Sequence, residues 1–143
     1  MNFRTQYSSD EWYTLQCAPV WVFVLVAGID GKIDKKEMES FAKNIAELAS
    51  KNIGFSKEIY QSIISDINHV MRLKSHGEAA LKGLITVNHL LKKINETDAT
   101  LYKQSLITLG NRVAESSGGL FKKNRSEKET QILALIFKIL ELD

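Results

Sequence analysis

Apolar side chains recur at helical spacing along nearly the whole chain. One example is the stripe formed by Met38, Phe41, Ala42, Ile45 and Leu48. No run of four to eight residues alternates apolar and polar positions in the way that a half-buried strand does. The pattern predicts an all-α protein. The 143 residues suit a single domain over residues 1–143, a compact helical bundle of about six or seven helices.

The most apolar segment, residues 20–29, carries no charged side chain on any face, which predicts a central buried helix. Pro19 precedes this segment and lacks a backbone N–H. We therefore expect the helix to kink there, or to restart with Pro19 in its first turn. Cys17 lies beside the same apolar residues, so we expect a buried and inert thiol. The apolar run is shorter than the ~20 residues that cross a bilayer, so no transmembrane segment is predicted.

Helix starts are predicted from pairs of polar residues three positions apart. In such a capping box, the first side chain accepts a hydrogen bond from the backbone N–H of the second residue. The second side chain accepts one from the backbone N–H of the first residue. The pairs are Ser8 with Glu11, Asp34 with Glu37, Ser75 with Glu78, and Ser126 with Glu129. Ser56 is predicted to cap a further helix, and Thr97 or Asp98 is predicted to cap another.

The apolar stripes of the middle and last helices define the rest of the expected core. One unbroken helix is predicted from Ser56 to His76, followed by two more helices. The expected core positions are Ile59, Tyr60, Ile63, Ile64, Ile67, Val70 and Met71 in the first of these, Leu81, Leu84, Ile85 and Leu91 in the second, and Tyr102, Leu106, Leu109 and Val113 in the third. Residues 116–125 are predicted to form a loop. The final helix is predicted over residues 132–142.

One part of the chain is echoed in another. Val26-Ala27, a turn with Gly31, and the pair Asp34 and Glu37 are matched by Val113-Ala114, a turn with Gly118, and the pair Ser126 and Glu129. The second turn is longer by five residues. The echo predicts two related helix–turn–helix units, arranged about a pseudo-twofold axis that would bring their turns near one another.

Residues 26–37, VAGIDGKIDKKE, resemble the A-x-x-D-G-x-I-x-x-x-E signature of the TerB-like tellurite-resistance family. The resemblance implies an all-helical fold with two such loops, whose acidic residues surround a divalent-metal site. It also implies bacterial origin and a role in tellurite resistance or stress, without a known reaction. The metal ligands that it implies here are Asp30, Asp34, Glu37 and Glu129. Ser117 stands where the family has Asp before the second glycine.

The chemistry of the acidic turn leaves two interpretations open. Asp30, Asp34 and Glu37 place three carboxylates within eight residues, and oxygen ligands are what calcium and magnesium take. Zinc is not favoured, because the chain has no His-x-x-x-His or Cys-x-x-Cys spacing. The same residues are also explained without any metal. Asp34 and Glu37 suit a capping box, and Asp30 with Gly31 suits a tight turn.

Composition excludes several classes of function. The net charge of +2 is too small to indicate a nucleic-acid partner. A single cysteine excludes an internal disulfide and agrees with a reducing compartment, and no signal segment is recognised, so a cytoplasmic location is expected. The chain has no glycine-rich phosphate loop, and no Cys/His or Ser/His pairing is suggested.

We therefore expect a non-enzymatic binding module that takes a divalent cation between its two acidic loops. The alternative is a metal-free helical scaffold for protein interactions, in which the acidic turns only cap helices. In that case the apolar final helix would contact a protein partner or a second copy of the chain. A hydrolase that uses a bound metal and a water molecule would need an open coordination position and a cleft.

Overall fold

The computed structural model describes residues 2–29, 33–72, 77–117 and 127–142, and within them it contains helices and no strands. These residues form seven α-helices and two short 3₁₀ helices. The elements are η1 Phe3–Gln6, α1 Ser9–Ala27, α2 Lys35–Lys51, α3 Gly54–Ser65, α4 Ile67–Met71, α5 Gly77–Leu90, η2 Leu91–Lys93, α6 Glu96–Ser117 and α7 Glu127–Ile139. The prediction of an all-α, single-domain bundle is confirmed.

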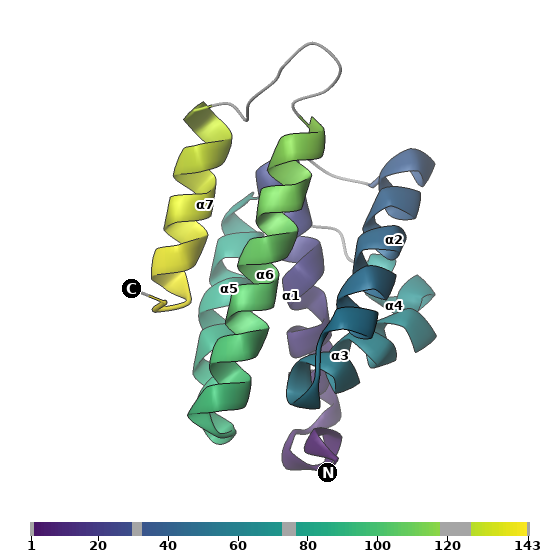
Figure 1. Ribbon diagram of the computed structural model, residues 1–143, viewed down its shortest axis with the longest axis vertical. Helices are drawn as coiled ribbons and strands as arrows, with labels where there is room; N and C mark the ends of the chain where they lie inside the picture. Colours follow the sequence, from purple (N-terminus) through teal and green to yellow (C-terminus); the bar gives the residue numbers. More distant parts are fainter. Residues whose placement is uncertain (1, 30–32, 73–76, 118–126, 143) are drawn as a thin grey trace.

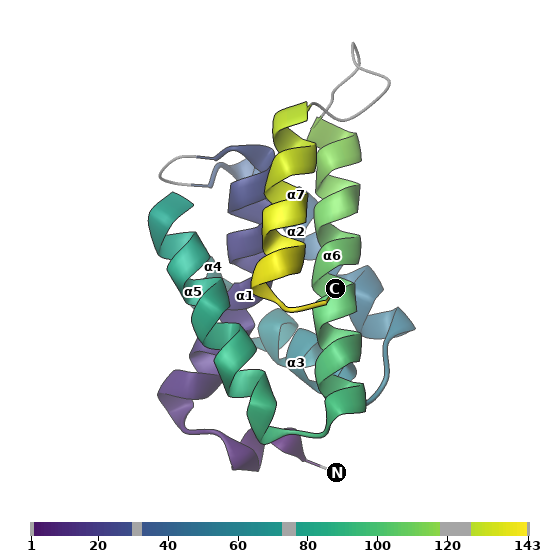
Figure 2. The same ribbon diagram turned by 90° about the vertical axis from the view of Figure 1, so that its left-hand side faces the viewer.

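Helix α1 runs through the centre of the bundle. It packs against α3, α4, α5, α6 and α7, and Figures 1 and 2 show these helices on several sides of it. Every residue from Leu15 to Val24 is buried. A central buried helix is confirmed, but its buried run lies earlier than the predicted residues 20–29, because Leu25, Ala27 and Ile29 are half-buried and Gly28 is exposed.

Pro19 lies inside α1, which continues without a break from Ser9 to Ala27, so the helix does not restart there. A proline has no N–H to donate to the carbonyl four residues earlier, which here belongs to Leu15. The hydroxyl of Tyr102, on α6, donates to that Leu15 oxygen at 2.8 Å, and both residues are fully buried. A side chain from another helix thus replaces the backbone bond that proline removes.

Two glycines allow other helices to approach α1 and α7 closely. A Cβ on Gly83 of α5 would lie 2.6 Å from ring atoms of Trp21, and a Cβ on Gly110 of α6 would lie 3.3 Å from Val22. The same Cβ on Gly110 would lie 2.5 Å from Leu133 of α7. Since ordinary carbon contacts are near 3.5–4.0 Å, a side chain at either glycine would push these elements apart.

The unbroken helix predicted from Ser56 is divided and starts earlier. Asp66 has φ −107° and ψ 22°, and it separates α3 from α4. Helix α3 begins at Gly54, so Ser56 is a buried residue inside it rather than its cap. The predicted core was also too wide: Ile64 is 44% exposed and Ile85 is 57% exposed. A helix on the outside of a bundle buries one face only, and these two side chains lie beyond that face.

The start of α3 is capped by a residue of α6. Oδ1 of Asp98 accepts the backbone N–H of Phe55 at 3.1 Å. Asp98 is therefore not the cap of its own helix, and neither is Thr97. That role belongs to Asn95, whose Oδ1 accepts the N–H of Asp98 at 2.8 Å. Asp98 is drawn toward α3 because the first N–H groups of a helix have no partner within the helix.

Two of the predicted helix starts have their capping residue outside the described residues. The structure does not describe Ser75 or Ser126, so the capping boxes assigned to them stay predictions. Helix α6 continues to Ser117, past the predicted start of the loop. Helix α7 runs from Glu127 to Ile139, so it begins before the predicted range of 132–142, as the capping box had implied, and ends before Leu142. The capping box of Ser8 and Glu11 is confirmed at the start of α1.

Replacing Tyr102 by Phe tests the bond that substitutes for the proline. We expect Tyr102→Phe to lower the free energy of unfolding by about 1–3 kcal/mol, because the Leu15 carbonyl loses its donor in a dry interior. In a Pro19→Ala background the Ala N–H can donate to Leu15, so the same change should cost less. Urea unfolding of the two single variants and the double variant measures this coupling. Strictly additive losses would contradict the explanation.

Gly83→Ala should destabilise the protein, although alanine normally favours a helix by ~1 kcal/mol relative to glycine. The new methyl group would overlap the Trp21 ring, and overpacking of this kind costs about 1–3 kcal/mol. Gly77→Ala is the matched control on α5, because its Cβ would approach its nearest neighbour, Leu25, only to 4.0 Å. Equal stability of the two variants in urea unfolding would show that α5 can move away without loss.

Candidate functional site

The described helix ends that flank the two predicted turns lie at the same end of the bundle. In Figures 1 and 2 the end of α1, the start of α2, the end of α6 and the start of α7 all lie at the end opposite the N-terminus. Both α6 and α7 pack on α1. The turns themselves, residues 30–32 and 118–126, lie outside the described residues, so contact between them stays a prediction.

A left-handed glycine ends α1 before the acidic turn. Gly28 has φ +69°, and its N–H and that of Ile29 both donate to the carbonyl of Val24. This is a usual way for a helix to end, because glycine adopts positive φ without strain. The sequence had suggested Gly31 for the turn, and that residue lies outside the described residues. Ile33 is buried and holds the chain against the core just before α2.

Asp34 and Glu37 form the predicted capping box at the start of α2. The N–H of Glu37 donates to Oδ1 of Asp34 at 2.8 Å, and the N–H of Asp34 donates to Oε1 of Glu37 at 2.9 Å. Within the described part of the chain, the second oxygen of each carboxylate makes no hydrogen bond or ion pair. Asp34 is exposed and Glu37 is half-buried. Each carboxylate therefore keeps one oxygen for another partner.

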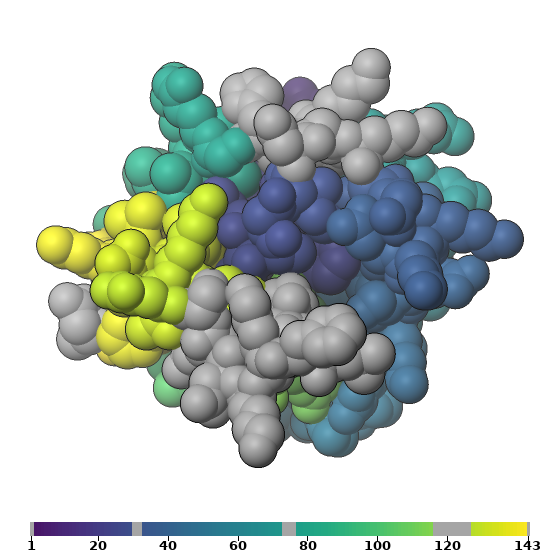
Figure 3. Space-filling view, turned by 90° about the horizontal axis from the view of Figure 1, so that it is seen from above, coloured from purple at the N-terminus to yellow at the C-terminus, as the bar shows by residue number. Residues whose placement is uncertain are grey.

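The two other predicted metal ligands are not joined to this pair by the described coordinates. Asp30 lies outside them. Glu129 is half-buried in the first turn of α7, and Figure 3 shows the first turns of α7 and α2 on opposite sides of the end of α1. In residues 2–29, 33–72, 77–117 and 127–142, no three His, Cys, Asp or Glu side chains gather to hold a metal ion. The four-carboxylate site stays a prediction.

A polar cleft lies toward the end of the bundle that holds the N-terminus. It has a volume of about 400 Å³ and is lined by η1 and by parts of α1, α3 and α4. Its polar side chains include Arg4, Gln16 and Asp66. The sequence did not reveal this cleft, because its residues come from separate segments and no local spacing links them. Asp66 lies within the segment whose apolar stripe predicted one unbroken helix, so nothing in the sequence marked it as a cleft residue.

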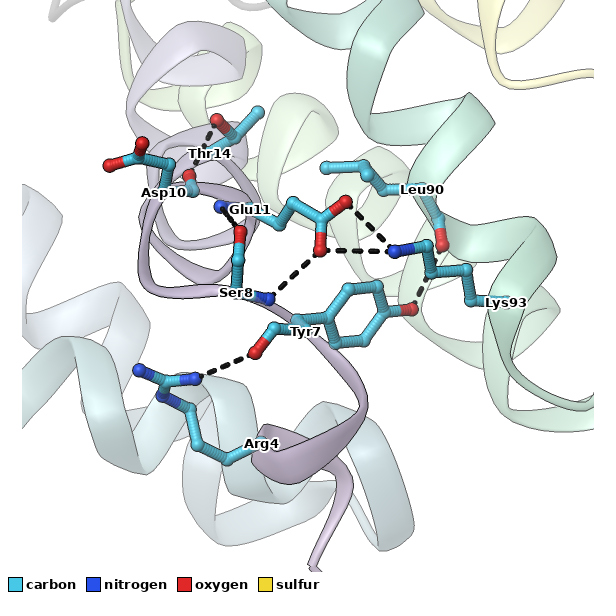
Figure 4. Close-up of polar contacts among 8 residues, drawn as sticks. All are labelled: Arg4, Tyr7, Ser8, Asp10, Glu11, Thr14, Leu90 and Lys93. Carbon is cyan, nitrogen blue, oxygen red and sulfur yellow. Dashed lines mark hydrogen bonds and ion pairs between the residues drawn. The ribbon is translucent and has the colours of Figure 1, made fainter.

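Polar contacts beside the cleft fix the N-terminal segment to the bundle (Figure 4). Nζ of Lys93 donates to both carboxylate oxygens of Glu11, at 3.0 and 2.8 Å, and the hydroxyl of Tyr7 donates to the carbonyl of Leu90. The hydrogen bond from Lys93, together with that from the Ser8 backbone, lowers the pKa of Glu11. Burial raises the pKa of Tyr7 to about 12. These groups are engaged in structure and are poor candidates for a ligand site.

The cysteine and the described histidines are the remaining candidates for chemistry. Cys17 is buried, and burial raises the pKa of its thiol to about 12, so the prediction of an inert thiol is supported. The ring of His69 lies 4.6 Å from that of Tyr13, and His89 is exposed. No helix among the described residues is long and apolar enough to cross a membrane.

A protein from Methanothermobacter thermautotrophicus, described as "Uncharacterized protein ORF11'", is 32% identical to this chain over 129 residues. The match covers 88% of this chain and 87% of that protein. This chain belongs to the ORF11' family. Because the match spans most of both proteins, members of the ORF11' family are expected to share the bundle as a whole. No family model and no solved structure matches the chain.

The state of Cys17 can be checked with a thiol reagent. At pH 8 a thiol with a pKa near 12 is almost wholly protonated, and the protonated form is not the nucleophile. We expect no reaction of the folded protein with 5,5′-dithiobis(2-nitrobenzoate) over minutes, and stoichiometric reaction after unfolding in guanidinium. Rapid labelling of the folded protein would show that α1 opens locally or that the thiol is activated.

Proposed function

We propose that the protein is a non-enzymatic, TerB-like binding module that takes a divalent cation at the end of the bundle where its two helix–turn–helix units turn. Calcium or magnesium is the expected cation, because the proposed ligands are carboxylate oxygens. The proposed ligands are Asp30, Asp34, Glu37 and Glu129. Cation binding would draw the turns together and change what this end of the bundle can dock. The resemblance to the TerB-like family adds a role in tellurite resistance or stress.

The observation that best supports this proposal is that the capping box uses only one oxygen of each carboxylate. The second oxygen of each is left without a hydrogen bond among the described residues. Oδ2 of Asp34 and Oε2 of Glu37 belong to side chains already held by hydrogen bonds of 2.8 and 2.9 Å. Ordering them around a cation therefore costs little side-chain entropy. The positive end of the α2 dipole opposes a cation at this position. Two carboxylates are thus too few, and the proposal requires the charges of Asp30 and Glu129.

A metal-free scaffold for protein interactions is the second candidate. The completeness of the capping box supports it, since Asp34 and Glu37 satisfy each other's backbone N–H without any cation. On α7, Leu135 and Phe137 are each 39% exposed and would give a protein partner or a second copy apolar contacts. Under this proposal, association depends on protein concentration and not on metal.

Calorimetric titration of metal-stripped protein with Ca²⁺, Mg²⁺, Mn²⁺ and Zn²⁺ separates the two candidates. We expect saturable one-site binding of Ca²⁺ or Mg²⁺. Glu37→Gln should weaken it by about tenfold or more, because a ligand charge is lost. Glutamine at this position can keep the capping bond, so the metal-free melting temperature should change little. Glu129→Gln shows whether the second unit contributes a ligand.

Glu11→Gln is the control, because it makes the same change in the capping box of α1, where no cation is proposed; it also removes the ion pair with Lys93, so only its cation affinity is compared. Its cation affinity should equal that of the unmodified protein. The absence of heat with all four cations would reject the cation site and leave the scaffold, which sedimentation at several concentrations then tests. Turnover of a phosphoester or an amide would contradict a non-enzymatic role.

A further inference from the structure

The cleft between η1, α1, α3 and α4 contains a cation that is held in place but has no acidic partner. Nη1 of Arg4 donates to the carbonyl of Tyr7 at 3.0 Å, as Figure 4 shows, and Nη2 donates to Oγ of Ser9 at 3.3 Å. The guanidinium carbon lies 5.6 Å from the centre of the Trp12 ring. Within the described residues no carboxylate forms an ion pair with Arg4. A guanidinium fixed in this way keeps N–H donors for a carboxylate.

The same cleft contains a carboxylate that has no cationic partner. Asp66 is at the N-cap position of α4, yet its side chain makes no capping hydrogen bond. Its Oδ2 instead accepts Nε2 of Gln16 at 2.9 Å. No Lys, Arg or His of the described residues forms an ion pair with Asp66. Asp66 is exposed, so its charge is open both to water and to a ligand in the cleft.

Gln16 adds an acceptor at the acidic side of the cleft. The residue is only 3% exposed, and its Nε2 is used twice, toward Oγ of Ser62 at 3.1 Å and toward Asp66. Both N–H groups of the amide are then engaged, which fixes the direction of the amide oxygen. In the described part of the chain that oxygen accepts no hydrogen bond. Asp66 and Gln16 together offer oxygens to an N–H donor.

The other acidic residue of the cleft does not neutralise Arg4. Oε1 and Oε2 of Glu58 accept the backbone N–H groups of Phe3 and Arg4, at 2.8 and 2.9 Å. Its carboxylate is thus engaged at the start of η1, where unpaired N–H groups need an acceptor. Among the Arg, Asp and Glu side chains that line the cleft, the guanidinium of Arg4 and the carboxylate of Asp66 remain open. His69 also lines it, with its ring 4.6 Å from that of Tyr13.

We propose that this cleft binds a small zwitterion, with its carboxylate on Arg4 and its ammonium group on Asp66 and Gln16. Arg4 lies over Trp12, and Asp66 is bonded to Gln16. Trp12 and Gln16 are four residues apart on α1, which is a rise of roughly 6 Å. We take this rise as the scale for the separation of the ligand's two charges, and a short ω-amino acid has that separation. The volume of about 400 Å³ is in the range of small-molecule sites. The site lies away from the acidic turn and does not depend on the proposed function.

Calorimetric titration with three five-carbon probes tests the pairing of charges. The probes are 5-aminopentanoate, cadaverine, which has only cationic ends, and glutarate, which has only anionic ends. We expect 5-aminopentanoate to bind at one site, about tenfold or more tighter than either of the others, because only it satisfies both sides of the cleft. Failure of 5-aminopentanoate to bind up to about 10 mM overturns the proposal, and so does equal or tighter binding of cadaverine or glutarate.

Asp66→Asn is the variant that tests the acidic side, because asparagine can still accept the bond from Gln16 while losing the charge. It should weaken 5-aminopentanoate by about tenfold, with an unchanged melting temperature. Asp10→Asn makes the same change on an exposed residue of α1 outside the cleft and should bind as the unmodified protein does. Arg4→Gln should also weaken binding. Unchanged affinity in Asp66→Asn overturns the proposal whether or not Arg4→Gln folds.

Discussion

The structure depends on the burial of one helix on nearly all sides. Residues 15–24 of α1 are buried without exception, and in such an interior every backbone group must find a partner. Pro19 leaves the carbonyl of Leu15 without its usual backbone donor. The hydroxyl of Tyr102 donates to that carbonyl instead, at 2.8 Å. Burial raises the pKa of Tyr102 well above its ordinary value, so the hydroxyl keeps its proton and remains a donor. The bond also joins α6 to α1 at a defined position.

The position of α6 on α1 has consequences for both ends of the molecule. At one end it brings the α6–α7 unit alongside the α1–α2 unit, where Gly110 leaves space that Val22 and Leu133 occupy. At the other end, Asp98 of α6 caps the first turn of α3 through Phe55. Helix α3 in turn contributes Glu58 and Ser62 to the polar cleft. The packing around α1 therefore positions both candidate sites.

The two candidate sites differ in how the protein has used their charges. At the acidic turn, Asp34 and Glu37 each use one carboxylate oxygen to cap the start of α2, and the positive end of the α2 dipole opposes a cation there. In the cleft, Arg4 and Asp66 are held by neutral partners, and their charges are left unmatched. Membership of the ORF11' family adds no reaction to either site. The chemistry of the side chains is what distinguishes them.

The sequence by itself determined the features that depend on neighbours along the chain. Helical periodicity, the central buried helix around Pro19, and the capping boxes at Ser8 and Asp34 all arise from residues three or four positions apart. Tertiary structure alone decided that Tyr102 completes the proline-containing helix, that Asp98 caps a different helix, and that Arg4 and Asp66 line one cleft. Each of these joins residues more than forty positions apart. No local spacing encodes such contacts, because they form only when the helices pack.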